Sequence, residues 1–463
     1  MNTRLLTLSL LACVVSAAVL GDDNWPQFRG HGGSGIGSGD PPTEWNPQSG
    51  HNIAWKTPIA GLGHSAPIAW GDRVFLTTAV NSETDRPSLE TGWSGGTGES
   101  AKDTGQWSWQ VICLQLDTGD ILWTKDAHVG EPKIKRHLKA SHANCTPATD
   151  GKYVVAFFGS EGLYCYDVDG HLVWKHDFGE LRSGPYDAPE LEWGFASSPI
   201  IHDGHVIVQC DCLNTNFVAI LDITTGQEVL RIDRDGEVAT WSTPLVVTTE
   251  DRLQIVCNGY HQMAGYDFRT GTRLWHLSDG GDVPVPAPLF ANGLIYLTNG
   301  HGRSPTYAIL PNATGDLTPR KGETSDEVSD HPGLAWWQPR DGSYMPTPLV
   351  KDDLLYTCND NGRLAVRNAV TGELIYRERV GKGSTTFSAS AVAAGGHVYF
   401  ASERGEVTVI EEGDSFQELA TNEMGEVVMA TPAISGDRLL IRTVANLYCI
   451  TTIPIADQVD NDE

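Results

Sequence analysis

The sequence is poor in basic residues for its length. Its 463 residues include 32 lysines and arginines against 59 aspartates and glutamates, which gives a formal net charge of −27. A surface with so strong a negative charge repels the phosphates of nucleic acids and the headgroups of anionic membranes. Both are therefore disfavoured as partners unless cations bridge the contact.

Apolar runs long enough to cross a membrane are also missing. The longest apolar stretch runs from Leu5 to Leu20, follows Arg4 and contains the small residues Ser16, Ala17 and Ala18. This pattern predicts a signal peptide at residues 1–21 and an exported protein, periplasmic or associated with the cell envelope. Leu10-Leu11-Ala12-Cys13 loosely resembles a lipoprotein processing site, so lipidation at Cys13 is left open.

Short motifs for metal binding are absent too. The sequence has no CxxC pair, no HExxH, no EF-hand loop and no CxxCH. Asn359 to Gly362 begins like a calcium loop but lacks the closing glutamate, so a hairpin turn is expected there. We predict no metal ligands and no catalytic residues. His137 and His142 adjoin a basic segment (133–139), which is expected to be a solvated loop.

The sequence is rich in one repeated pattern, seen in full from Tyr344 to Tyr376. Four short apolar runs follow one another there, separated by Asp352-Asp353, by Asp360-Asn361-Gly362 and by Thr371-Gly372. Turn residues of this kind between apolar runs predict β-hairpins. A meander this small cannot bury both of its faces, so it must be one unit of an array.

The first strand of the unit recurs eight times. Its signature is a small residue, then proline and two apolar residues, although some copies match loosely and one has alanine for proline. The shortest proline-to-proline intervals, ending at Pro244 and Pro288, are 45 and 44 residues, the length of a four-stranded propeller blade. The copies are Ala66-Pro67, Thr146-Pro147, Ser198-Pro199, Thr243-Pro244, Ala287-Pro288, Thr347-Pro348, Ser390-Ala391 and Thr431-Pro432.

A second signature marks the fourth strand. A turn glycine is followed four residues later by a large side chain, as in Gly119 and Trp123 or Gly170 and Trp174. The same spacing recurs from Gly226, Gly271 and Gly372. A large flat side chain at one fixed place in each blade is expected to wedge between neighbouring sheets.

The two ends of the chain complete the ring. The last blade ends after its third strand near Ile450, whereas Gly50 to Lys56 resembles a fourth strand without its predecessors. Pairing residues 53–57 with residues 447–451 would close the ring and remove both free edges. The predicted fold is all-β: an eight-bladed propeller of four-stranded antiparallel blades, closed by an N-terminal strand.

This organisation divides the chain into a signal peptide (1–21), an N-terminal lead-in (22–50), the propeller (51–455) and an acidic tail (456–463). Insertions are expected at 79–110 in blade one, with Trp93, Trp107 and Trp109, and at 301–332 in blade five. The tryptophans either fix the first insertion to the body or form a binding surface. Whether the insertions are lids or ligand sites is left open.

Cysteines fall at equivalent places in different blades. Cys113, Cys165 and Cys449 share a third-strand position, and Cys210 and Cys257 share the end of the second strand with Cys358. Equivalent positions lie far apart round the ring, beyond disulfide reach. We expect these cysteines to be small buried hydrophobic residues, and disulfide pairing elsewhere is left open.

Candidate binding residues stand just ahead of the first strands, where loops reach one end of the central channel. They are rich in aromatic, methionine and histidine side chains and poor in charge. Such an apolar rim on an acidic protein suggests a contact surface for a protein or peptide, or else a plug of the channel mouth. The partner-binding candidates are His64, Trp193, Trp241, Tyr344, Met345 and Phe387.

The repeat resembles the pyrroloquinoline-quinone-like (PQQ-like) propeller repeat of exported bacterial proteins. The resemblance rests on the blade pattern and on the segments Asn24 to Gly30, Ser304 to Ile309 and Tyr344 to Leu349. Chains of this kind are often grouped with BamB, the scaffold of outer-membrane β-barrel assembly, which binds protein and catalyses no reaction. The resemblance implies a non-enzymatic scaffold with a protein partner in the cell envelope.

Two alternatives remain open. Quinoprotein dehydrogenases of alcohols or sugars share the repeat, and many have adjacent cysteines beside the quinone and a calcium held by Glu, Asn and Asp. This sequence has no adjacent cysteines, and no positions match the calcium ligands. The other alternative is a carbohydrate-active propeller like a polysaccharide lyase, with roles for His64, His142 and Tyr344. The expected cofactor is none, with PQQ and calcium as the alternative.

Overall fold

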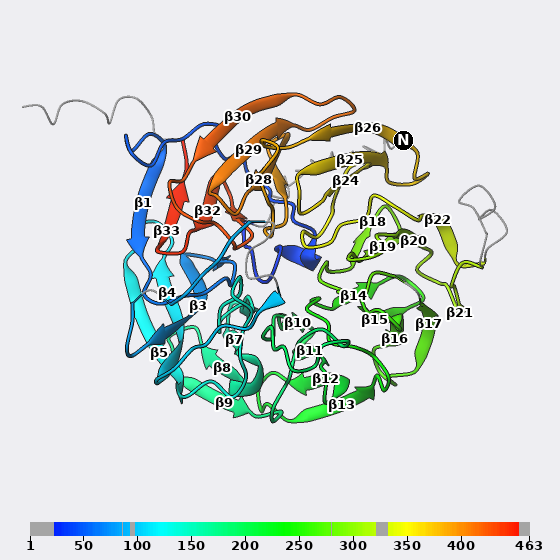
Figure 1. Cartoon of the computed structure of the whole chain (residues 1–463), viewed down its shortest axis with the longest axis horizontal. Coiled ribbons are helices and arrows are strands. Elements are labelled where there is room, and N and C mark those ends of the chain that lie inside the picture. The colour runs from blue at the N-terminus through cyan, green and yellow to red at the C-terminus, as the bar shows by residue number, and fades with distance from the viewer. Residues whose placement is uncertain (1–22, 86, 93–97, 279, 321–331, 453–463) are drawn as a thin grey trace, which may run out of the picture.

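A computed structural model describes residues 23–85, 87–92, 98–278, 280–320 and 332–452 of the chain. Eight antiparallel sheets stand in a ring round a central channel, and Figure 1 looks down the channel axis. The predicted eight-bladed propeller is confirmed. Among the described residues, no helix is long and apolar enough to span a bilayer.

Each blade contributes four consecutive strands, from the innermost at the channel to the outermost at the rim. Blades one to four consist of β2 (Ile68–Trp70), β3 (Arg73–Asn81), β4 (Trp107–Gln115) and β5 (Ile121–Gly130); β6 (Ala148–Thr149), β7 (Tyr153–Phe157), β8 (Leu163–Asp167) and β9 (Leu172–His176); β10 (Ile200–His202), β11 (His205–Asp211), β12 (Asn216–Asp222) and β13 (Glu228–Asp233); and β14 (Leu245–Thr248), β15 (Leu253–Cys257), β16 (Met263–Asp267) and β17 (Arg273–Leu277).

Blades five to eight follow the same order, except that the last blade takes its outer strand from the other end of the chain. They consist of β18 (Leu289–Ala291), β19 (Leu294–Thr298), β20 (Thr306–Ile309) and β22 (Leu334–Gln338); β23 (Leu349–Lys351), β24 (Leu354–Cys358), β25 (Arg363–Asn368) and β26 (Leu374–Arg379); β27 (Val392–Ala394), β28 (His397–Ala401), β29 (Glu406–Glu411) and β30 (Glu418–Glu423); and β31 (Ala433–Ser435), β32 (Arg438–Arg442), β33 (Asn446–Ile450) and β1 (Ile53–Pro58).

The ring closes as the sequence predicts. Strand β1 pairs antiparallel with β33, with Trp55 opposite Cys449 and Thr57 opposite Leu447. Figure 1 shows the blue β1 beside the red β33. Because the two ends of the chain share one blade, opening the ring requires breaking a strand ladder rather than only an interface.

Hydroxyl groups ahead of the inner strands join neighbouring blades. The hydroxyl oxygen at this position accepts the backbone N–H of the equivalent residue in the preceding blade, at 2.9–3.1 Å in the six links that form. We call these six residues the hydroxyl belt: Thr146, Ser198, Thr243, Thr347, Ser390 and Thr431. The belt is interrupted at Ala66 and Ala287, which have no hydroxyl and lie four blades apart.

Tryptophans provide a second connection between blades, nearer the rim. The indole Nε1 of Trp174 in β9 donates to the carbonyl of Ile223 in the next blade at 2.7 Å. Its ring covers Gly226, where φ is 70° and an added Cβ would lie 2.5 Å from the indole. The predicted wedge therefore also donates a hydrogen bond. Equivalent bonds run from Trp55 to Leu116, from Trp123 to Val168 and from Trp336 to Ala369.

The insertion in blade one is shorter than predicted. Trp107 and Trp109 belong to β4 and are buried in the core rather than in the loop, and Trp93 lies outside the described residues. Strand β3 extends to Asn81, so the insertion comprises residues 82–106. The β3–β4 ladder extends from the pair Arg73–Gln115 to the pair Asn81–Trp107, and the insertion begins at its end.

The insertion predicted at 301–332 in blade five also contains regular structure. Its first part is β20, the third strand of the blade, and its next part is β21 (Gly315–Asp316). Strand β21 pairs in parallel with β17 and adds a fifth strand to the rim of blade four. Leu317, directly after β21, is buried against this edge.

The lead-in crosses the ring and closes one end of the channel. Trp25 pairs with Ala69 in blade one, and Ile36 pairs with Ala393 in blade seven. Between these contacts lies the short 3-10 helix η1 (His31–Gly33), the blue segment at the centre of Figure 1. The Arg29 guanidinium is fully buried and donates to five carbonyl oxygens. Burial lowers its pKa to about 9.

The eight cysteines of the described chain are buried and free. Cys165 stands opposite Trp174, and Cys449 stands opposite Trp55, as the shared third-strand position requires. The expectation that the cysteines act as small buried hydrophobic residues is confirmed for the positions named.

A second short 3-10 helix, η3 (Gly159–Glu161), lies between β7 and β8.

Removing one hydroxyl of the belt should destabilise the protein. In Thr347→Val, the buried N–H of Ala287 loses its acceptor at 2.9 Å, and an unsatisfied buried donor costs about 1–3 kcal/mol. Thr386→Val is the matched control, because Thr386 Oγ1 is buried without a hydrogen-bond partner among the described residues. Urea unfolding should show the loss for Thr347→Val alone. Equal stability of the two variants would contradict a structural role for the belt.

Candidate functional site

The predicted rim residues converge on one cavity. A cavity of about 840 Å³ lies at the end of the channel opposite the lead-in, and its walls include His64, Trp193, Trp241, Tyr344 and Met345. The sixth candidate does not contribute, because Phe387 is 1% exposed and packs in the core of blades six and seven. Five candidates from loops far apart in the sequence thus share one site.

Propeller geometry explains this convergence. The loop that enters each inner strand and the turn between the two middle strands both lie at the same end of the ring. The belt hydroxyls line the cavity below these loops, and Phe28 of the lead-in lines it too. The loops surround the cavity at this end of the ring, which we call its mouth.

Aromatic side chains form one wall of the cavity. The rings of Trp193 and Trp241 lie 5.7 Å apart and are tilted by 33°, and His137 meets Trp193 edge-on. Both indoles are fixed by hydrogen bonds, from Trp193 to Gly98 and from Trp241 to Gly194. The first of these bonds ties the insertion of blade one to the loop between blades two and three, so this wall is held in place from two sides.

His64 lies in the wall of blade one as a neutral imidazole. Its Nε2 lies 3.1 Å from the carbonyl oxygen of Lys139. Burial, together with the charges of Arg442 and Arg136, lowers the pKa of His64 to about 3. A group that stays neutral at ordinary pH contributes packing and hydrogen bonding here rather than charge.

A salt bridge crosses the mouth from blade two to blade seven. Lys139 Nζ lies 2.7 Å from Glu403 Oε1, and the other carboxylate oxygen accepts the N–H of Gly92 at 2.7 Å. Ser388 also donates to Glu403, and Lys139 donates to the carbonyl of Gly92. Glu403 therefore holds the blade-one insertion against the far side of the ring. No sequence pattern singles out this pair, because 264 residues separate its members.

The prediction of a solvated loop for the basic segment beside His142 holds for Lys133 and Lys135, which are exposed, and is wrong for Arg136. Arg136 is fully buried, and its guanidinium lies 2.7 and 3.0 Å from the Asp103 carboxylate. His142 Nε2 lies 2.9 Å from the same carboxylate, and its ring meets Trp107 edge-on. Contacts with Arg136 and His142 lower the pKa of Asp103 despite its partial burial.

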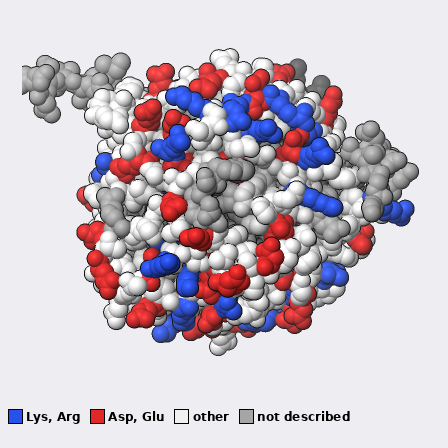
Figure 2. All heavy atoms as spheres, in the orientation of Figure 1, with Lys and Arg blue, Asp and Glu red and all other residues white. Residues whose placement is uncertain are grey.

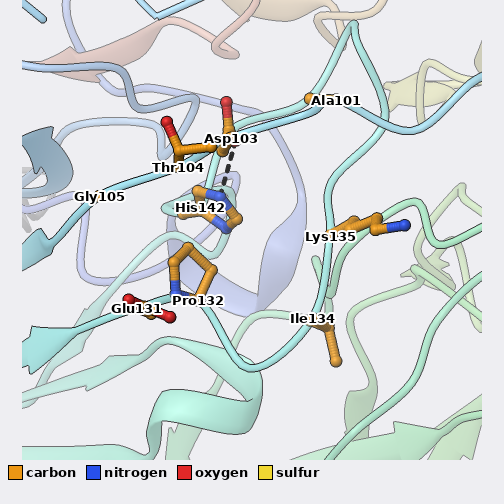
Figure 3. A pocket seen from close by; sticks show the side chains of 9 residues that line it. All are labelled: Ala101, Asp103, Thr104, Gly105, Glu131, Pro132, Ile134, Lys135 and His142. Carbon is orange, nitrogen blue, oxygen red and sulfur yellow. Dashed lines mark hydrogen bonds and ion pairs between the residues drawn. The ribbon is translucent and has the colours of Figure 1, made fainter. Parts of the chain in front are cut away.

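This cluster borders a second, smaller cavity of about 250 Å³. Figure 3 shows Asp103 directed toward His142, with Pro132 and Glu131 on the opposite side. Thr104 lines the same cavity, and its hydroxyl donates to Glu83. The Asp103–His142 pair anchors the insertion to the segment after β5. No group of three or more His, Cys, Asp or Glu in the described chain could hold a metal ion.

Charge is mixed over the end of the ring seen in Figure 2. Acidic and basic side chains alternate there, and basic side chains gather along the edge above blades six and seven. On the face that Figure 2 shows, the acidic residues are therefore distributed rather than concentrated in one patch. A distributed negative charge acts on partners through long-range attraction and repulsion, whereas recognition depends on the cavity itself.

Comparison with known proteins identifies the family. The family described as outer membrane protein assembly factor BamB matches residues 108–329 and 329–454. The chain belongs to this family. Its resemblance to the PQQ-like propeller repeat is confirmed by this match, and no curated protein matches the sequence.

Solved structures share the fold at low sequence identity. BamB from Moraxella catarrhalis is 14% identical, with a TM-score of 0.52 over 85% of this chain and 98% of that chain. The C-terminal WD40 domain of Sif2 is 11% identical, with a TM-score of 0.51 over 86% and 97%. Quinohemoprotein alcohol dehydrogenase from Comamonas testosteroni, 12% identical with a TM-score of 0.49 over 93% and 80%, is too distant to inform function.

The neutral state of His64 predicts a specific sensitivity to acid. Its folded pKa of about 3 lies below the ordinary value of 6.5, so its contribution to stability is full above pH 6.5 and falls as the pH drops toward 3. His64→Gln keeps a donor but cannot titrate, and its loss of stability between pH 7 and pH 5 should be about 2 kcal/mol smaller than that of the wild type.

Denaturant unfolding at each pH measures this difference. His171→Gln is the control, because the imidazole of His171 is 77% exposed. Parallel pH profiles for the wild type and His64→Gln would show that His64 is not the group responsible.

Proposed function

We propose that this protein is an exported, non-enzymatic scaffold that binds another protein of the cell envelope at the mouth of its propeller. The observation that carries the proposal is the convergence of His64, Trp193, Trp241, Tyr344 and Met345 on one cavity. Aromatic and methionine side chains are the types enriched where proteins bind one another. The family match supports a binding role of this kind.

The form of the cavity favours insertion of a partner's side chains. The cavity has room for a side chain or a short loop, because its volume of about 840 Å³ is in the range of ligand pockets. The hydrogen bonds of both indoles hold the aromatic wall in one arrangement before any partner arrives. Preorganised walls lower the entropic cost of binding.

The donor set does not fit a quinone with calcium. Calcium takes six to eight oxygen ligands, and the cavity wall offers two carboxylates, Asp360 and Glu403. Glu403 is already engaged by Lys139, Ser388 and Gly92. We propose on this ground that the protein binds no quinone. The signal peptide, the periplasmic or envelope location and the segment boundaries at 22–50, 51–455 and 456–463 are parts of the same proposal.

Truncating the rim should weaken partner capture. In Trp241→Ala/Met345→Ala, two half-buried side chains of the cavity wall are lost, and loss of central contacts of this type costs at least about tenfold in affinity. The immobilised mature protein should retain less of its partner from envelope extract. Ile121→Ala/Leu122→Ala is the matched control, because these apolar side chains are exposed on the outer strand of blade one. Undiminished capture by a folded double variant would remove the mouth as the contact surface.

A quinone titration tests the enzyme alternative directly. PQQ with calcium is expected to leave the melting temperature of the purified protein unchanged. A ligand that binds only the folded state stabilises it by about 2.7 kcal/mol at a hundredfold excess over its dissociation constant. A clear rise in melting temperature would contradict the scaffold proposal, and oxidation of alcohols and sugars would then be assayed.

A further inference from the structure

One side of the cavity carries an unbalanced negative charge. Asp360, in the turn after β24, and Glu403, in the turn after β28, both line it, and Lys139 is the cation bound to Glu403. Arg303, the other Lys or Arg side chain that lines the cavity, is exposed in the loop after β19 in blade five. Lys139 pairs with Glu403, whereas Asp360 forms no ion pair with any residue that the structure describes. The wall formed by blades six and seven therefore has two carboxylates and one ammonium group.

The surroundings of Asp360 include two buried polar atoms without a hydrogen-bond partner among the described residues. The backbone N–H of Phe387 donates to the Asp360 carbonyl at 2.8 Å, which places Thr386 next to the Asp360 turn. Asn359 Oδ1 and Thr386 Oγ1 are buried and have no hydrogen-bond partner in the described part of the chain. Burial raises the pKa of Asp360, and the nearby Lys139 partly offsets this effect. A buried acceptor without a donor costs free energy that a ligand can recover.

We infer that the partner inserts a lysine side chain into this cavity and pairs its ammonium group with Asp360. This inference rests on the proposed function and names the chemistry of the contact. A lysine ammonium supplies one positive charge and three N–H donors, which matches one unpaired carboxylate and the two neighbouring acceptors, Asn359 and Thr386.

The molecule already holds one lysine in this way. Lys139 crosses the mouth to reach Glu403, and its ammonium also donates to the carbonyl of Gly92. A second ammonium at Asp360 would complete the charge balance of the wall. Tyr344 lines the same cavity, and the Asp360 charge contributes to raising the pKa of its phenol, after the larger effect of burial.

The overall charge favours the same ligand. A net charge of −27 attracts a basic segment over distances greater than any contact. The basic side chains visible along one edge in Figure 2 lie on the outer surface, whereas Asp360 lines the cavity. A lysine can reach Asp360 through the mouth because its charged group lies at the end of a long, flexible chain.

Blocked tripeptides test the inference with purified components. A peptide with a central lysine should bind the mature wild-type protein in isothermal titration calorimetry, whereas peptides with central alanine or glutamate should not. Asp360→Asn should bind the lysine peptide about tenfold more weakly or not at all, because a close charge pair is removed. Asp203→Asn, at an exposed turn between β10 and β11, changes the net charge equally and should bind like the wild type.

Any one of the following results would contradict the inference. Equal binding of the lysine peptide by Asp360→Asn, or no binding by the wild type, would exclude Asp360 as an ammonium site. Tighter binding of an arginine peptide would exclude lysine as the preferred group, and calcium binding that requires Asp360 while the peptide does not bind would assign the site to a metal ion. Partner capture that persists in the wild type and is lost in Trp241→Ala/Met345→Ala would leave the proposed function standing in all these cases.

Discussion

The structure depends on how the N–H groups at the start of each inner strand are satisfied. These groups face the channel at the junction of two blades, where no strand ladder reaches them, and a buried N–H without a partner is costly. The neighbouring blade supplies the acceptor through the hydroxyl of Thr146, Ser198 or one of their four equivalents. Each blade is therefore complete only beside the next one, and the ring is a single cooperative unit rather than a row of independent sheets.

The two interruptions of the belt show how specific this requirement is. At the junction of blades eight and one, where Ala66 has no hydroxyl, Arg442 donates to Ser65 and to the carbonyl of Thr77. At the junction of blades four and five, Ser242 and Asn258 both donate to the carbonyl of Pro286. Different side chains thus join the blades wherever the repeated one is missing. The closed ring in turn fixes the positions of the loops that form the cavity.

The sequence predicted the fold well because the repeat carries local and global information together. The turn residues and the small residue before proline predicted strand order, and the incomplete last blade predicted the pairing of Trp55 with Cys449. Trp336 was missed as a wedge because its nearest glycine, Gly333, precedes it by three residues rather than four. Trp107 and Trp109 were assigned to a loop because a polar insertion hides the extension of β3 and β4.

The site was predicted less completely, for a physical reason. The five rim residues that line the cavity were found because each stands at a repeated place in its blade. Lys139, Glu403 and Arg136 were missed as site or anchor residues because their partners come from other loops, and no repeat specifies such contacts. The burial of Arg136 in particular could not be predicted from the basic segment around it, since an arginine among lysines and histidines normally lies in solvent.

The distribution of charge connects the fold with binding. Two guanidinium groups, those of Arg29 and Arg442, are fully buried and bonded to carbonyl and hydroxyl oxygens rather than to carboxylates. Burial lowers the pKa of both to about 9, so both remain charged at neutral pH. They place positive charge within the ring, beneath a mouth that carries Asp360 and Glu403. Glu403 is engaged by Lys139, whereas Asp360 is available to a cationic partner. The acidic exterior meanwhile repels anionic surfaces.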